Sequence, residues 1–193
     1  MPAGDISSLA IGITGHRFLD EPEKIKAGLR QAFRLLADTI PERSWTLITS
    51  LAEGADRLVI QEARQIRPFR LVVPLPLPLN DYTQDFSTQE SRTEFTALLA
   101  SAERVVELPR QVDRHAAYAA AGRYIVEHSD VLMAVWDGQE PQGAGGTGDT
   151  IAEARRLSLP IAWVHAGNRQ AGTCLPTTLG GEQGLVTYEN MSF

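Results

Sequence analysis

The sequence predicts an α/β fold, with a doubly wound, mostly parallel sheet and helices on both faces. Two observations support this prediction. Short apolar runs alternate along the chain with segments of helical periodicity, and each run is apolar throughout rather than at every second residue. Continuous apolar runs are typical of parallel strands that are covered on both faces. A repeated strand-helix order is the pattern of doubly wound sheets.

Six apolar runs are the predicted strands. They lie at residues 9–14, 45–50, 69–75, 104–108, 130–136 and 160–165. The segments between them place apolar or small side chains three or four residues apart, which is the spacing of one helix face. These side chains are Ile25, Leu29, Phe33, Leu36 and Ile40; Ala55, Leu58, Val59, Ala63 and Ile66; and Tyr118, Gly122, Ile125 and Val126.

Length and composition indicate one soluble domain. The chain has 193 residues, of which 43% are hydrophobic and 22% are charged, so we predict a single domain over residues 1–193. The net charge of -6 argues against nucleic acid as a partner, because that binding usually requires a basic face. Residues 166–193 are a C-terminal extension for which three arrangements remain open: an added edge strand, packing over the sheet, or a loose tail.

Neither a membrane partner nor a metal site is expected. The N-terminal apolar run at residues 9–14 is too short for a membrane span or a signal-peptide core, so we expect a cytoplasmic protein. Cys174 is the single cysteine and cannot form an internal disulfide. The histidines are scattered without the spacing of metal ligands.

The predicted helix starts carry capping signals. Asp20 precedes Pro22, which suits a cap followed by a proline in the first turn. In the motifs SLAE and TIAE a glutamate, Glu53 or Glu153, follows a hydroxyl residue by three positions. Such pairs cap helices through reciprocal hydrogen bonds. A ligand-binding or catalytic role for either glutamate is the alternative.

A glycine-rich loop follows the apolar run that ends at Trp136, and five glycines lie between residues 138 and 148. Gly145, Gly146 and Gly148 let the backbone approach an anion closely, and the helix start that follows supplies unpaired N–H groups. The helix dipole contributes only about 0.3–1 kcal/mol, so firm binding of a phosphate needs a further cation.

Arg17 is the predicted cation. It follows the first strand in the motif GITGHR, and loops that follow parallel strands emerge at the same edge of the sheet. A guanidinium group can bind a phosphate through two hydrogen bonds. The alternative is a surface ion pair of Arg17 with Asp20 or Glu21. His16 could donate to an anion, act as an acid near neutral pH, or pack over the loop.

Together the motifs resemble the SLOG superfamily. They are GITGHR after the first strand, SLAEGADRL after the second, PLPLP after the third, and VWDG followed by GGTGDTIAEA. This superfamily includes the lonely-guy phosphoribohydrolases, DNA-processing protein A and molybdenum-cofactor carrier proteins. The resemblance covers roughly residues 8–165 and depends on the order of the motifs. It implies a Rossmann-like domain that binds a nucleotide or a nucleotide-derived molecule.

The resemblance also implies a set of site residues. On the phosphate side these are Gly145, Gly146, Thr147, Gly148, Asp149 and Thr150, which would face Gly15, His16 and Arg17. The neighbouring wall would consist of Ser50, Glu53, Gly54 and Asp56. Magnesium could accompany a polyphosphate ligand, and relatives are usually homodimers.

An enzymatic function is the main alternative. The segment AGGTGDTIAE matches the lonely-guy pattern Pro-Gly-Gly-x-Gly-Thr-x-x-Glu only in part. An alignment that keeps the glycines places Ala152 at the glutamate position, and one that keeps Thr150 and Glu153 places Thr147 and Asp149 at glycine positions. The same segment resembles nucleoside deoxyribosyltransferases, whose glutamate is a nucleophile. Glu153 with Asp137, or Glu53 with Asp56, could then supply the two carboxylates of an N-glycosidic hydrolase or transferase. A structural protein without a small ligand is the third alternative.

Overall fold

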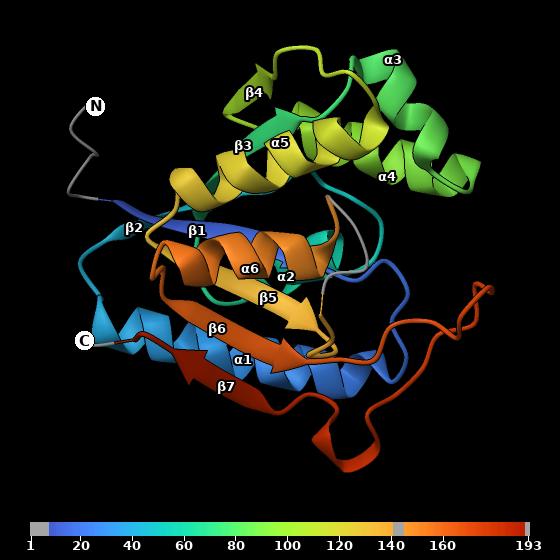
Figure 1. Ribbon diagram of the computed structural model, residues 1–193. Coiled ribbons are helices and arrows are strands. Elements are labelled where there is room, and N and C mark those ends of the chain that lie inside the picture. The colour runs from blue at the N-terminus through green and yellow to red at the C-terminus, as the bar shows by residue number, and fades with distance from the viewer. Residues whose placement is uncertain (1–7, 141–144, 192–193) are drawn as a thin grey trace.

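The strands of the protein form one seven-stranded sheet in the computed structural model, which describes residues 8–140 and 145–191 (Figure 1). They are β1 (Ser8–Gly15), β2 (Ser44–Ile48), β3 (Phe69–Leu75), β4 (Arg104–Glu107), β5 (Val131–Trp136), β6 (Ile161–His165) and β7 (Val186–Glu189). Their order is β4-β3-β2-β1-β5-β6-β7, and only β7 pairs antiparallel among them. The predicted doubly wound, mostly parallel sheet is therefore confirmed.

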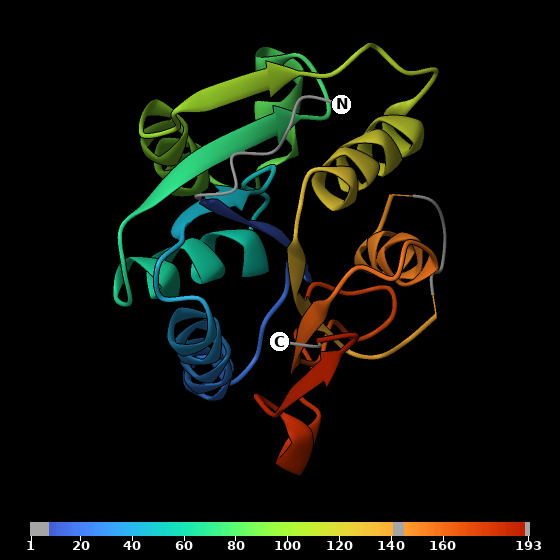
Figure 2. The ribbon, with the colours of Figure 1, turned by 90° about the vertical axis from the view of Figure 1, so that its left-hand side faces the viewer.

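Helices cover both faces of this sheet, so that the molecule has three layers (Figure 2). The described helices are α1 (Pro22–Thr39), α2 (Ala55–Arg64), α3 (Leu79–Tyr82), α4 (Gln89–Ala100), α5 (Arg114–Glu127) and α6 (Thr147–Arg156), with 3₁₀ turns η1 (Thr83–Asp85) and η2 (Gly180–Glu182). The buried residues of α1, α2 and α4 pack on one face, and those of α5 and α6 pack on the other. None of the helices within the described ranges is both long and apolar enough to cross a membrane.

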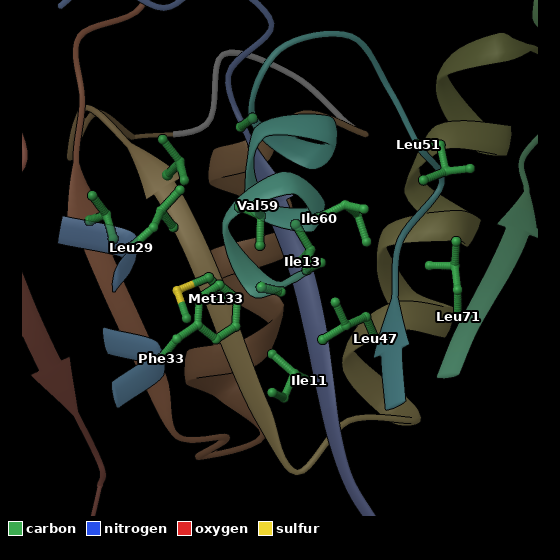
Figure 3. Packing of buried hydrophobic residues seen from close by; sticks show 14 of the residues in the cluster. Ile11, Ile13, Leu29, Phe33, Leu47, Leu51, Val59, Ile60, Leu71 and Met133 are labelled. Carbon is green, nitrogen blue, oxygen red and sulfur yellow. The ribbon is translucent and has the colours of Figure 1, made fainter. Parts of the chain in front are cut away.

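The core is divided by the sheet because successive strand residues point to opposite faces. Leu71 and Val73 of β3 belong to the core with α1 and α2, whereas Val72 belongs to the core with α5 and α6. Figure 3 shows the first of these cores, where Phe33 of α1 lies against Met133 of β5. Burial on both faces explains why the strands are apolar throughout, and the predicted strands agree with the observed ones to within two residues at each end.

The predicted cap of α1 is wrong. This helix begins at Pro22, and its N-cap is Glu21, which has a left-handed backbone with φ of 47°. Asp20 accepts a hydrogen bond from the Glu21 N–H at 2.8 Å. The Asp20 carboxylate therefore stabilises the turn before the helix and does not cap the helix itself.

The two predicted capping boxes are also absent. Such a box needs a hydroxyl residue at the N-cap and a glutamate three residues later. The N-caps of α2 and α6 are instead Gly54 and Gly146. Glu53 therefore precedes its helix, and Glu153 lies in the second turn of α6.

The C-terminal extension adds an edge strand to the sheet. Strand β7 pairs antiparallel with β6, and Val164 lies opposite Val186. Residues 166–185 form the connection between the two strands and lie at the carboxyl edge of the sheet, where they are drawn in orange and red in Figure 1. Of the three arrangements left open by the sequence, the edge strand is the one observed.

A substitution at Phe33 tests the packing of the core on the α1 face of the sheet. Its side chain is fully buried and stacks on Trp45 with ring centroids 5.2 Å apart. Phe33→Ala should lower the free energy of unfolding by about 3–5 kcal/mol, because it leaves a cavity in a packed interior. Leu35→Ala on the same helix, at a side chain that is 37% exposed, should cost less than about 1 kcal/mol. Urea denaturation measures both, and equal losses would contradict this description of the core.

Candidate functional site

The candidate site lies at the carboxyl edge of the sheet, where β1 and β5 are neighbours. After β1 the chain builds β2, β3 and β4 on one side, and it then returns to place β5 and β6 on the other side. The loops that follow β1 and β5 therefore diverge and leave a cleft, which is the usual ligand position in such sheets. A cavity of about 720 Å³ lies there, within the range of about 300–1,000 Å³ usual for small-molecule sites.

Most of the predicted site residues line this cavity. They are Gly15, His16, Arg17, Ser50, Glu53, Asp56, Asp137, Gly145, Gly146, Thr147, Gly148, Asp149 and Thr150. Gly54 lines an adjoining cavity of about 440 Å³, which shares Arg17 and Glu53 with the first. Glu153 lines neither. The loops after β1, β2 and β5 therefore meet at one cavity.

A glycine at the start of α2 places this helix directly against the loop after β1. Gly54 has φ of 82°, and a Cβ atom there would lie 2.3 Å from the carbonyl oxygen of Arg17. The next N–H, that of Ala55, donates to the carbonyl oxygen of His16 at 3.0 Å. A residue with a side chain would clash with this backbone, so Gly54 determines how His16 and Arg17 are presented.

The second glycine contact holds the loop before α6. Gly145 has φ of 84°, and a Cβ atom there would lie 2.7 Å from the carbonyl oxygen of His115 in α5. The Gly145 N–H donates to the Asp149 carboxylate at 3.0 Å. The N–H groups of residues 147–149 have no acceptor within the helix, as in the first turn of any α-helix. Since these residues line the cavity, α6 offers backbone donors to an anion.

Arg17 is held by aromatic and polar neighbours. Its guanidinium lies over the Tyr118 ring, 5.9 Å from the centroid. The Tyr118 hydroxyl donates to Asp85, and Asp85 accepts two hydrogen bonds from Arg114 at 2.8 and 2.7 Å. Within the described residues no ion pair joins Arg17 to a carboxylate, and Glu21 pairs with Lys24 at 2.6 Å. The surface ion pair considered as an alternative for Arg17 is therefore not formed.

His16 joins the loops after β1 and β5. Its Nε2 atom lies 3.1 Å from both the backbone nitrogen and the Oδ1 atom of Asp137. Burial lowers the pKa of His16, and the Asp137 carboxylate only partly offsets this effect. The imidazole is therefore neutral near pH 7 and accepts a hydrogen bond from the Asp137 N–H. Asp137 in turn accepts a hydrogen bond from the Gln139 N–H at 3.1 Å.

Asp56 is a buried carboxyl group in the wall of the cavity, and it is 5% exposed. It accepts hydrogen bonds from the Thr49 hydroxyl at 2.7 Å and from the Ala52 N–H at 3.1 Å. Burial raises the pKa of Asp56 to about 6, although these hydrogen bonds and two nearby arginines favour the charged form. The group can therefore act as a hydrogen-bond acceptor or as a donor at physiological pH.

Glu53 connects the cavity wall to α4. It accepts hydrogen bonds from the Ser87 N–H and hydroxyl, both at 2.9 Å, and from the Ser91 hydroxyl at 2.5 Å. Burial opposes ionisation of this carboxylate, but the serine hydrogen bonds lower the pKa of Glu53 overall. Glu53 is therefore an ionised structural group rather than a proton donor. No cluster of three or more potential metal ligands occurs within residues 8–140 and 145–191.

Glu153 does not occupy the place expected of a nucleophile. Its two carboxylate oxygens accept hydrogen bonds from Arg156 at 2.8 and 2.6 Å, and this contact lowers the pKa of Glu153. Because α6 begins at Thr147, Glu153 lies beyond the turn that lines the cavity. Of the predicted pair Glu153 and Asp137, only Asp137 faces the cavity.

Several lining residues were not predicted from the sequence. They are His115 and Tyr118 of α5, Asp85 and Ser87 after α3, and Asn168 and Arg169 of the C-terminal extension. His115 lies beside Arg114 and near Arg110 at the start of α5, and this basic cluster is a weak signal in the sequence for an anion contact. Asn168 and Arg169 lie in a segment with little periodicity, and only the contacts of the fold bring them to the site.

The fold and the cleft define a Rossmann-like α/β protein, and solved structures share this fold. The chain is similar to DNA processing protein A from Helicobacter pylori, with a TM-score of 0.55 and 17% identity over 85% of this chain and 67% of that one. It is also similar to the molybdenum cofactor binding protein of the phototrophic bacterium Rippkaea orientalis, with a TM-score of 0.51 and 16% identity over 83% of this chain and 78% of that one. No protein-family model matches the sequence, and no curated protein matches it.

DNA-processing protein A and molybdenum-cofactor proteins are two of the groups named above as members of the SLOG superfamily. The Rossmann-like fold that the resemblance to this superfamily implied is therefore confirmed. The single-stranded DNA bound by the first protein and the molybdenum cofactor bound by the second are properties of those proteins. At such low identity, function has to be argued from the residues of the cavity itself.

Asp56 makes stability depend on pH. Its pKa of about 6 in the folded state lies above the ordinary value of 3.8, so the folded protein binds this proton more tightly than the unfolded chain. The protonated Asp56 therefore stabilises the folded state fully below about pH 4. This stabilisation, on the order of 2–3 kcal/mol, is lost as the pH rises through about 6. Urea denaturation between pH 4 and 7 should show this loss in the wild type and not in Asp56→Asn. The exposed Asp38→Asn is the control, and an unchanged pH dependence in Asp56→Asn would contradict the assignment.

Proposed function

We propose that residues 1–193 form one domain that binds a phosphate-bearing nucleotide or nucleotide-derived molecule at the carboxyl edge of its sheet. The observation that supports this function is that Arg17 and the first turn of α6 line the same cavity of about 720 Å³. Backbone N–H groups at a helix start and a guanidinium group are the two common protein ligands of phosphate. The phosphate would rest between them.

The rest of the ligand would extend along the wall that contains Asp56. An ionised Asp56 can accept a hydrogen bond from a sugar hydroxyl, and a protonated one can donate to an oxygen or a ring nitrogen. A magnesium ion would arrive with a polyphosphate ligand, because phosphate oxygens are ligands that Mg²⁺ prefers.

Ligand binding can be tested by calorimetry with AMP, ADP and ADP-ribose, with a single-stranded DNA oligonucleotide as a comparison. Arg17→Ala should weaken nucleotide binding at least about tenfold, because a hydrogen bond to a charged group contributes about 1.5–3 kcal/mol. Arg34→Ala removes an exposed arginine of α1 that does not line the cavity, so it should leave the affinity unchanged. No binding at millimolar nucleotide would favour a structural or interaction role instead.

A second candidate function is an N-glycosidic hydrolase or transferase that acts on nucleoside monophosphates. Asp137 lines the cavity beside His16, and Asp56 has a carboxyl pKa of about 6. Cleavage of the bond between sugar and base requires a carboxylate near the anomeric carbon and an acid that protonates the leaving base. Asp137 and Asp56 would take these roles, since Glu153 lies outside the cavity.

Release of free base from nucleoside monophosphates tests this second function. If it occurs, Asp137→Asn should reduce the rate at least about a hundredfold, which is the usual contribution of a catalytic carboxyl group. Glu153→Gln should leave the rate unchanged, because its partner is Arg156 at the surface of α6. Loss of base release in Glu153→Gln alone would restore Glu153 to the mechanism.

A further inference from the structure

The C-terminal extension contributes a second cation to the cavity. Arg169 and its neighbour Asn168 lie just after β6, and both line the same cavity as Arg17. These residues lie outside the sequence motifs that were predicted to form the site. Their position depends on the connection between β6 and β7, residues 166–185.

A buried glutamine fastens this connection to the loop that carries Arg17. Gln183 is 4% exposed, and its Oε1 atom accepts hydrogen bonds from the Gly167 N–H at 3.0 Å and the Leu179 N–H at 3.1 Å. Its Nε2 atom donates to the carbonyl oxygen of Asp20 at 2.8 Å. All three polar contacts are to backbone, so the connection cannot move away from the loop between β1 and α1 without leaving buried polar groups unpaired.

The turn that contains Arg169 is fixed at its base. The Thr177 N–H donates to the carbonyl oxygen of Asn168 at 2.8 Å, and the Asn168 N–H donates to the Thr177 hydroxyl at 3.1 Å. Arg169 itself forms an antiparallel bridge with Pro176. The Arg169 side chain is thus presented from an ordered backbone, which reduces the entropy lost when it binds a ligand.

Both arginines contact aromatic rings and have no acidic partner. The Arg169 guanidinium lies 5.4 Å from the centroid of Phe18, the residue that follows Arg17. Arg17 lies over Tyr118 in the same way. Within the described part of the chain, no carboxylate lies within ion-pair distance of either guanidinium. No ion pair among the described residues therefore competes with a ligand for either guanidinium, and the other close partner of Arg17 is the Tyr118 side chain.

Of the six acidic side chains that the described residues place in the cavity, five are already engaged by the protein, and the sixth, Glu140, is exposed. Asp85 is paired with Arg114, Glu53 accepts three hydrogen bonds from serines, and Asp149 accepts one from Gly145. These contacts reduce the repulsion that the carboxylates exert on an anionic ligand. Arg17, Arg169 and the backbone N–H groups at the start of α6 together offer more hydrogen-bond donors than one phosphate group needs.

We propose that Arg169 binds a second phosphate of the ligand, so that the site prefers nucleoside diphosphates and diphosphate-linked nucleotides over nucleoside monophosphates. One phosphate rests on Arg17 and the first turn of α6, and the next one reaches Arg169. This inference rests on the proposed nucleotide binding. It adds the ligand class and a residue that determines specificity.

Calorimetric titration of the full chain with AMP and with ADP tests the proposal. The wild type should bind ADP about tenfold or more tightly than AMP, since each tenfold step corresponds to the gain from one charge-assisted contact. Arg169→Ala should remove this preference, with ADP weakened by roughly tenfold and AMP changed by less than about twofold. Arg169→Glu should weaken ADP further, because it places a negative charge beside the second phosphate.

Two other variants separate this proposal from the nucleotide-binding function itself. Arg17→Ala should weaken AMP and ADP alike, and Arg34→Ala should change neither. If AMP binds in an Arg17-dependent way but Arg169→Ala weakens both nucleotides equally, or neither of them, the role of Arg169 is overturned and the proposed function stands. If neither nucleotide binds to the wild type, both proposals are overturned. Thermal unfolding confirms that each variant is folded, which is expected because Arg169 is exposed.

Discussion

The position of β1 between β2 and β5 is the constraint on which the site depends. A parallel sheet places the carboxyl ends of its strands at one edge, and the chain leaves β1 and β5 in opposite directions across that edge. The cleft between the two loops follows from this topology and needs no special residue. The end of β1, which is paired on both sides at the centre of the sheet, lines this cleft with Ile13, Thr14 and Gly15.

Close backbone contacts turn the cleft into a site with defined chemistry. Gly54 and Gly145 let α2 and the loop before α6 touch neighbouring backbone, which orients Arg17 and the first turn of α6 toward one cavity. The surroundings of the acidic groups then shift their pKa values in opposite directions. Glu53, with three hydrogen bonds from serines, is held as an anion, whereas Asp56 is shifted toward neutrality. A cavity with donors on one side and a titratable carboxyl group on the other suits a ligand with a phosphate and a polar body.

The edge strand β7 has a consequence beyond the sheet. Its pairing with β6 closes the connection of residues 166–185 into a loop, and Gln183 holds that loop against the segment that follows β1. Residues 166–185, which have little periodicity of their own, are thereby fixed beside the GITGHR motif at the end of β1. The site is consequently assembled from both ends of the chain, and the stability of the last strand and the geometry of the cavity are linked.

The sequence by itself determined the six parallel strands, the helices α1, α2 and α5, and the loops that meet at the carboxyl edge, because two-sided burial and helix periodicity are local patterns. It also marked the glycine-rich loop and Arg17, since these lie directly after strands. It could not determine where α2 and α6 begin. Gly54 caps α2 where its backbone touches the loop after β1, and the residue before the α6 cap, Gly145, is held against α5. The sequence also could not determine that Glu153 pairs with Arg156 at the surface, or that Arg169 lines the cavity. The hydrogen bond that anchors its loop joins residues 163 positions apart, and such a contact exists only once the chain has folded.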